Sequence, residues 1–125
     1  MWARASSRVR PARNSTALDA PETIVLMSQE ILSIAIFQPL EGQEPASLDT
    51  MRALIAALSA GGYSRDLLYR DAKSRTEYIL LRYWKSEAAR RAALEDPEVL
   101  RCWAKLAQEI RTVKIYETLE EALAP

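Results

Sequence analysis

Two short segments of the chain carry apolar side chains at both odd and even positions. They are residues 31–37 and residues 76–84. Successive side chains of a β-strand point to opposite faces of its sheet, so a strand that is apolar at both parities is predicted to be buried on both faces. Two such strands limit the fold strongly, because each must lie in the middle of a sheet that is covered on both sides.

A helix is predicted after the first of these strands. In residues 47–60 apolar side chains recur at helical spacing, and Ser47 is placed to cap the first turn. Gly61 and Gly62 then permit the left-handed backbone that often ends a helix. A second, more polar strand is predicted over residues 67–71.

The second helical region follows the strand at residues 76–84 and is predicted in two pieces. Ser86 caps the first piece, and Asp96, which precedes a proline, caps the second. Residues 112–118 are predicted to form the last strand, with Val113 and Ile115 directed inward. The order is therefore strand, helix, strand, strand, helix, strand.

This order predicts an α+β fold of the ferredoxin-like βαββαβ type, with a four-stranded antiparallel sheet. Right-handed crossovers place the first and third strands in the centre of such a sheet. Those are the two strands that are apolar on both faces, so the hydrophobic pattern and the topology agree.

The second face of the sheet predicts a homodimer. Two helices cover only one face, and the other face carries large apolar side chains. Each of them contributes about 1.5–3 kcal/mol when buried. Half a dozen per subunit give roughly 10 kcal/mol, which is comparable with an association cost of about 4–15 kcal/mol. We therefore expect two copies to pack sheet against sheet and close into a dimeric α/β-barrel.

Composition excludes several classes of function. Lysine plus arginine equals aspartate plus glutamate, 17 against 17, so no net charge favours nucleic acid. The apolar runs are too short to span a membrane. Histidine is absent, and Cys102 is the single cysteine, so no metal site and no cofactor are expected. One cysteine also favours a reducing compartment, and the predicted location is the cytoplasm.

The N-terminal segment differs from the rest of the chain. Residues 1–18 contain four arginines and no acidic residue. We expect residues 1–27 to form a poorly ordered basic tail and residues 28–125 to form the domain. An organellar transit peptide at residues 1–18 is the alternative. Met27 is a second possible start of translation.

A resemblance to a known family rests on two stretches. Residues 77–88, EYILLRYWKSEA, and residues 96–99, DPEV, are similar to the antibiotic biosynthesis monooxygenase superfamily. The resemblance spans residues 31–123 and implies a dimeric α/β-barrel with a pocket between helices and sheet. It also implies an oxidoreductase that oxidises small aromatic, quinol-like or polyketide-like substrates without a cofactor. Trp84 matches the strand-end tryptophan of the oxygenases.

The sequence also departs from that family. Haem-degrading members use a histidine, which this chain lacks, and the asparagine often found near the tryptophan is missing, since Asn14 is the only asparagine. No catalytic residue is therefore assigned.

Four residues are candidates for lining a substrate pocket. Tyr78, Arg82 and Trp84 share one face of a predicted strand, and Trp103 lies in the apolar stripe of the last helix. Arg82 could hold a carboxylate or phenolate. The alternative for both tryptophans is ordinary core.

Other charged residues have simpler interpretations. An internal ion pair of Arg82 with Glu109 or Glu117 competes with its role in substrate binding. Arg90 and Arg91 are predicted to lie on a solvated helix face.

Two functions remain after these arguments. The first is a cofactor-independent monooxygenase that acts on a small aromatic substrate. The second is a non-catalytic dimeric barrel that binds a small apolar ligand or a partner. An open cavity reached by Arg82 or a tyrosine favours the enzyme, and a packed interior around the tryptophans favours the second.

Overall fold

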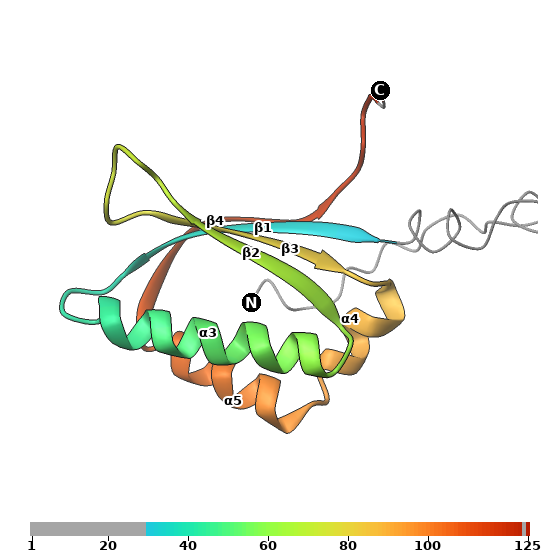
Figure 1. Cartoon of the computed structure of the whole chain (residues 1–125), viewed down its shortest axis with the longest axis horizontal. Coiled ribbons are helices and arrows are strands. Elements are labelled where there is room, and N and C mark those ends of the chain that lie inside the picture. The colour runs from blue at the N-terminus through green and yellow to red at the C-terminus, as the bar shows by residue number, and fades with distance from the viewer. Residues whose placement is uncertain (1–29, 124) are drawn as a thin grey trace, which may run out of the picture.

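The structure is a computed structural model, and it describes residues 30–123 and 125. The predicted tail, residues 1–27, lies outside the described residues. The described part contains four strands and three helices in the order β1, α3, β2, β3, α4, α5, β4 (Figure 1). Their bounds are β1 Ile31–Pro39, α3 Glu44–Ala60, β2 Ser64–Arg70, β3 Tyr78–Trp84, α4 Glu87–Ala93, α5 Pro97–Leu106 and β4 Ile110–Leu119.

The four strands form one antiparallel sheet in the order β2-β3-β1-β4. The predicted ferredoxin-like fold is confirmed, and β1 and β3 occupy the central positions expected for them. All three helices lie against the same face of the sheet (Figure 1). No helix among the described residues is long and apolar enough to cross a bilayer.

The hydrophobic core lies between this face and the helices. The odd positions of β1 and the even positions of β3 point into it, in agreement with the alternation in the sequence. The largest buried apolar side chains are Phe37, Met51, Leu54, Leu58, Leu80, Trp84, Val99 and Leu106.

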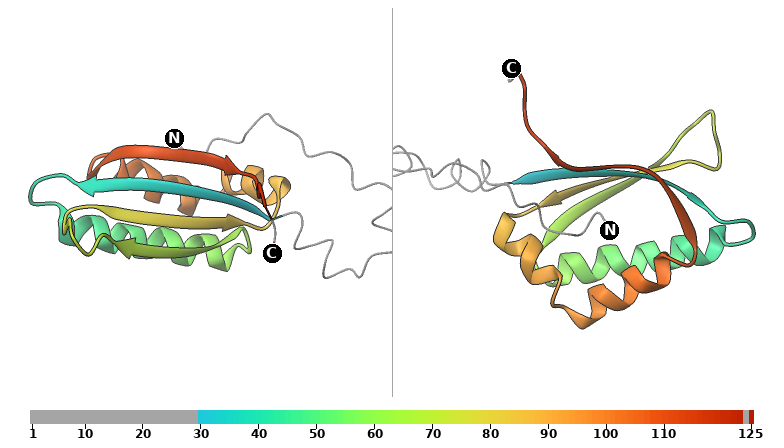
Figure 2. Two further views of the ribbon diagram at one scale, coloured as in Figure 1. Left: turned by 90° about the horizontal axis from the view of Figure 1, so that it is seen from above. Right: turned by 180° about the vertical axis from the view of Figure 1, so that it is seen from behind.

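The opposite face of the sheet is open and apolar. No helix covers it in any of the three views (Figure 2). On the edge strand β2, Leu67 and Tyr69 are 44% and 53% exposed. Strand pairing aligns these two residues with apolar residues of the central strands and of β4. The apolar surface that they form together consists of Leu32, Ile34, Ile36, Leu67, Tyr69, Ile79, Leu81, Tyr83, Tyr116 and Leu119. We call this set the open sheet face.

The first helix begins earlier than predicted. Helix α3 starts at Glu44, because Pro45 fits the first turn, where no backbone N–H is needed. Ser47 is not its cap. Its side chain is buried, and its hydroxyl donates to the carbonyl oxygen of Glu44 at 2.9 Å. At the other end Gly62 has the expected positive φ of 71°, whereas Gly61 is right-handed.

The second and third strands also differ in extent from the prediction. Strand β2 begins three residues before the expected Leu67, and β3 begins at Tyr78 rather than at Thr76. Ser64 opens β2 opposite Trp84, so its small polar side chain lies at the buried end of the pair. The two later helices are capped as expected. The Ser86 hydroxyl accepts from Ala89 N–H, and the Asp96 carboxylate accepts from Glu98 N–H.

Strand β4 contains two bulges that change which side chains face inward. Between the pairs Ile36–Lys114 and Phe37–Thr112, Val113 is an extra residue without a partner in β1. It is 43% exposed, so its predicted inward orientation is wrong. Ile115 pairs with Ala35 and packs against the core as expected. A bulge shifts the two-residue period, which alternation alone does not reveal.

The end of α3 gives a test of the backbone. We expect Gly62→Ala to destabilise the fold by about 1 kcal/mol, because a Cβ is unfavourable at positive φ. The melting temperature should fall by about 4–8 °C in a thermal melt followed by circular dichroism. Gly62→Asn is the control, and its melting temperature should fall less, since asparagine tolerates this conformation. An equal fall in melting temperature for the two variants would contradict the explanation from backbone conformation.

Candidate functional site

The strand-end tryptophan lies at one end of the helix-covered face. Trp84 closes β3 and pairs with Ile31 of β1 and Ser64 of β2. Its side chain is fully buried, and its indole Nε1 donates to the Ser33 hydroxyl at 3.1 Å. Ser33 in turn donates to the carbonyl oxygen of Glu117 at 2.6 Å. The ring is therefore fixed in orientation through hydrogen bonds that join three strands.

Arg82 is held in an ion pair beside this ring. Its Nε donates to the Asp66 carboxylate at 2.7 Å, and the two side chains are 0% and 1% exposed. The two residues are direct cross-strand partners in β3 and β2. Burial lowers the pKa of Arg82, and the Asp66 charge opposes that shift. The ion pair predicted as an alternative is present, but its partner is Asp66 and not Glu109 or Glu117.

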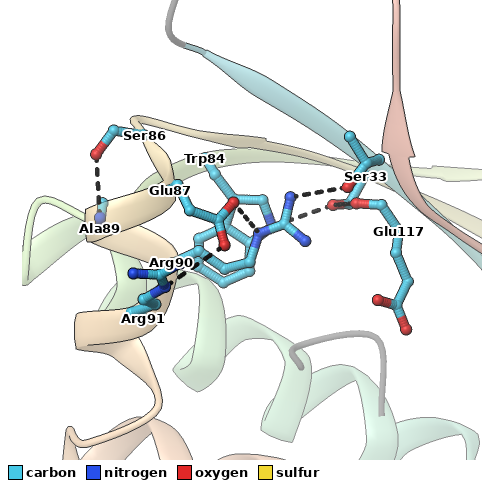
Figure 3. Close-up of polar contacts among 9 residues, drawn as sticks. Ser33, Trp84, Ser86, Glu87, Ala89, Arg90, Arg91 and Glu117 are labelled. Atoms are coloured by element: carbon cyan, nitrogen blue, oxygen red, sulfur yellow. Dashed lines mark hydrogen bonds and ion pairs between the residues drawn. The ribbon is translucent and has the colours of Figure 1, made fainter. Parts of the chain in front are cut away.

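Arg90 reaches the same tryptophan from α4. The prediction of a solvated Arg90 is wrong, because its side chain is fully buried; its neighbour Arg91 is 61% exposed, as expected. The guanidinium carbons of Arg82 and Arg90 lie 5.5 and 5.7 Å from the Trp84 ring centroid. Both distances allow cation–π attraction. Figure 3 shows Arg90 against the indole.

The polar contacts of Arg90 leave part of its guanidinium unused. Nη2 donates to the Thr118 hydroxyl at 3.2 Å. Nε lies 3.9 Å from the Glu87 carboxylate (Figure 3). Within the described residues, neither Nε nor Nη1 has a hydrogen-bond acceptor. Burial lowers the pKa of Arg90, while Glu87 and Glu117 oppose the shift. Buried donors without acceptors are uncommon and unfavourable, so they mark a position where a ligand can supply the acceptor.

Helical spacing in the sequence indicates that Arg90 is buried, although its charge favours an exposed position. Arg90 and Ala93 are three residues apart and are the two buried residues of α4. Such spacing places both on the face that packs against the sheet. A pattern that counts arginine as polar assigns this position to the surface, although the long side chain can reach the sheet.

The other two sequence candidates, Tyr78 and Trp103, do not share the polar contacts of this cluster. Tyr78 begins β3, six residues from Trp84, which corresponds to about 20 Å along a strand. Its ring is stacked on Phe37, and its hydroxyl donates to the Glu44 carboxylate. Burial is the main cause that raises the pKa of Tyr78, and the hydrogen bond to Glu44 raises this pKa further. Trp103 is 5% exposed in the core, and its indole N–H has no acceptor among the described residues.

The hollows on the described part of the surface include two of similar volume. One, of about 180 Å³, lies at the turn between β1 and α3, where Pro39, Leu40, Glu41, Gly42, Glu44 and Thr76 line it. The other, of about 190 Å³, lies between α3 and β2 and is lined by Leu48, Met51, Arg52, Ile55 and Leu68. Neither is lined by Trp84, Arg82 or Arg90. Residues 30–123 and 125 contain no group of three histidine, cysteine or acidic side chains that could hold a metal.

The two buried arginines should differ in their effect on stability. We expect Arg82→Met to destabilise the fold by about 3–5 kcal/mol, because it leaves the Asp66 carboxylate buried without its partner. Arg90→Met should change stability by less than about 1 kcal/mol, since few contacts are lost and a buried guanidinium is desolvated at a cost. Urea denaturation measures both.

A double variant serves as the control for this comparison. Arg82→Met combined with Asp66→Leu should recover most of the stability lost by Arg82→Met alone, because no buried charge remains. Equal losses for the two single arginine variants would contradict the distinction between them.

Comparison with known proteins supports the fold. No protein-family model and no curated protein sequence matches the chain. Among solved structures, SnoaB, a cofactor-independent oxygenase from Streptomyces nogalater, is 19% identical with a TM-score of 0.63, over 78% of this chain and 99% of that one. A protein from Pseudomonas aeruginosa is 23% identical with a TM-score of 0.62, over 72% and 92% of the two chains.

A third structure comes from Chloroflexus aurantiacus and is provisionally named as an antibiotic biosynthesis monooxygenase. It is 16% identical to this chain with a TM-score of 0.63, over 77% of this chain and 97% of the other. At these identities the likeness establishes the fold. The chain has the ferredoxin-like fold that is found in SnoaB and in this antibiotic biosynthesis monooxygenase-like structure.

Proposed function

We propose that the chain is a cofactor-independent oxygenase that acts on a small aromatic compound with an ionisable phenol or enol. The observation that carries the proposal is the buried guanidinium of Arg90, which keeps unused donors beside the face of Trp84. An aromatic anion complements this pair, since its ring can stack on the indole and its oxygen can accept from Arg90. The fold shared with an oxygenase supports the same assignment.

The reaction follows from the chemistry of such an anion. Loss of a proton from a phenol or enol to solvent produces an electron-rich anion whose charge is shared between oxygen and carbon, and this anion can reduce O₂ directly. Arg90 stabilises the negative charge on the substrate oxygen and so favours the deprotonated form. In the net reaction an activated CH₂ group and O₂ give a ketone and water, with one oxygen atom in each product. The substrate supplies all four electrons.

Access to Arg90 requires a local movement. Its side chain and Trp84 are both fully buried beneath α4. Helix α4 has only seven residues, and it packs on the sheet through Arg90 and Ala93. A short helix with so few buried side chains is the element that separates most easily from the sheet. We propose that the substrate enters between α4 and the end of β4.

The buried ion pair of Arg82 favours a second function. Its ion pair with Asp66 is complete and buried, so it is not available to hold a substrate as the sequence suggested. Together with the burial of both tryptophans, this favours a non-catalytic barrel that binds a small apolar ligand. Measuring ligand binding and oxygen uptake separately distinguishes the two functions.

We propose that the working form is a homodimer. The open sheet face contains ten apolar side chains on four adjacent strands. Monomeric proteins rarely expose a contiguous patch above about 300–600 Å². A second copy that packs the same face against this one buries it and gives the α/β-barrel expected from the sequence.

Ligand binding can be tested with the anthrone dithranol. In a Trp2→Phe background, we expect saturable quenching of tryptophan fluorescence by dithranol and oxygen-dependent formation of the anthraquinone above the buffer rate. Arg90→Met should raise the dissociation constant by about 10–100-fold, because it removes a charge-assisted hydrogen bond. Fluorescence titration and an oxygen electrode measure these quantities.

The matched control for this test is Arg91→Met. Arg91 is adjacent in α4 but 61% exposed, so its loss should leave affinity and rate unchanged. Saturable binding without oxygen uptake supports the non-catalytic function. Binding that is equal in wild type and Arg90→Met contradicts the assigned site.

The dimer can be tested by sedimentation equilibrium at micromolar concentration. We expect twice the 14.1 kDa chain mass for the wild type. Leu67→Asp on the open sheet face should raise the dimer dissociation constant more than about 100-fold. The substitution places one charge from each of the two subunits in the buried interface, and burying an unpaired charge is unfavourable. Leu100→Asp, at a residue 43% exposed on α5, is the control and should leave the mass unchanged. A monomeric wild type would contradict the dimer.

A further inference from the structure

A carboxylate lies beside the guanidinium to which the proposed function assigns the substrate oxygen. Glu87 stands three residues before Arg90 in α4, and its Oε1 is 3.9 Å from Arg90 Nε (Figure 3). Residues three apart in a helix lie on the same side, so the two groups keep their relative position when α4 moves as a unit. One short helix therefore carries both a hydrogen-bond donor for an anion and a group that can accept a proton.

The Glu87 carboxylate keeps an acceptor atom that no donor uses. Its Oε2 is buried, and no described residue donates a hydrogen bond to it. Arg91 Nε lies 3.8 Å from Oε2, which is beyond hydrogen-bond distance. A glutamate in the first turn of a helix interacts favourably with the helix dipole. The dipole does not account for the buried oxygen, because that atom has lost the hydrogen bonds of water without replacing them.

The separation of Glu87 and Arg90 fits a hydroxyl group between them. A hydrogen bond to either side chain is about 2.8 Å long, so one oxygen atom can contact Arg90 Nε and Glu87 Oε1 at the same time. That oxygen accepts from the guanidinium and donates its own proton to the carboxylate. A direct hydrogen bond between the two side chains would leave no space for it.

We infer that Glu87 is the general base that removes the hydroxyl proton of the substrate, while Arg90 binds the oxygen from which the proton leaves. This inference rests on the proposed function and names the residue through which the proton reaches solvent. The side chain of Glu87 is 21% exposed, so it connects the buried site with water. Glu117 also acts on Arg90 through its charge, but Figure 3 shows its carboxylate directed away from the guanidinium.

The proton and electron steps balance around this carboxylate. Glu87 takes the O–H proton, and the substrate anion passes two electrons in turn from its activated carbon to O₂, which forms a C–O bond and a peroxide. The carboxylic acid of Glu87 returns the proton to the peroxide. The carboxylate then takes the remaining C–H proton as the O–O bond breaks, which leaves the ketone and a hydroxide ion. Glu87 protonates the hydroxide to water and ends as the carboxylate that it was at the start.

The test is the rate of oxygen uptake with dithranol for Glu87→Gln in the Trp2→Phe chain, which serves as the reference. Glutamine keeps the shape of glutamate but accepts no proton, so kcat should fall about 100-fold or more. The dissociation constant from fluorescence quenching should change little, which also shows that the variant is folded. Glu98→Gln is the matched control and should behave as the reference. Glu98 also lies in the first turn of a helix and pairs with an arginine three residues later, but it is 54% exposed.

A second measurement separates a base from a residue that only positions Arg90. At a pH at which dithranol is already ionised in solution, as its absorption spectrum reports, the first proton transfer is no longer needed. Glu87→Gln should then approach the reference rate, whereas Arg90→Met should stay slow, because the anion still lacks its donor. A Glu87→Gln rate that is reduced by the same factor at both pH values overturns the inference.

The outcomes separate the base from the proposed function. If the reference chain consumes no oxygen with dithranol, the proposed function fails and the base fails with it. If the reference chain is active and Glu87→Gln is equally active near neutral pH, the oxygenase stands and only the inference is overturned. Equal losses for Glu87→Gln and Glu98→Gln also overturn it, because the charge in the first turn then explains both.

Discussion

One-sided covering of the sheet is the constraint on which the other features of this structure depend. All three helices lie in connections between strands and pack on the same face, so the inner side chains of β1 and β3 enter a closed core. The other face keeps its apolar side chains in contact with solvent. A sheet that is apolar on both faces is stabilised in water by a second layer, and in the proposed homodimer a further copy of the chain supplies that layer by symmetry.

Charge is concentrated at one end of the core. Two buried guanidiniums lie 5.5 and 5.7 Å from the centroid of the Trp84 ring, and they differ in their hydrogen-bond partners. Arg82 has a carboxylate at 2.7 Å and therefore serves the fold, as a buried pair that cannot lose one member without a large cost. Arg90 has one hydroxyl acceptor at 3.2 Å and a carboxylate at 3.9 Å, which leaves donors for a ligand. The proposed function assigns ligand binding to Arg90 and not to Arg82 because of this difference in partners.

The alternation of apolar residues in strands and their spacing in helices were sufficient to predict the fold, because both patterns follow directly from which side chains are buried. The double-sided apolar pattern of β1 and β3 predicted their central positions, and caps at Ser86 and Asp96 placed the later helices. The same rules were wrong for Val113, since a bulge changes the strand period without changing the composition. They also misplaced Arg90, because a rule based on charge cannot show that a long side chain reaches back beneath its own helix.

The sequence by itself determined the element order, the two central strands and the apolar second face, because local periodicity is a property of the chain alone. Only the tertiary structure decided which charges meet. Asp66 and Arg82 are 16 residues apart and become partners through the register of β2 on β3. Arg90 and Thr118 are 28 residues apart and meet because α4 packs across the end of the sheet. Such contacts depend on the strand register and on the angle at which a helix packs. Neither can be derived from the residue type at a single position.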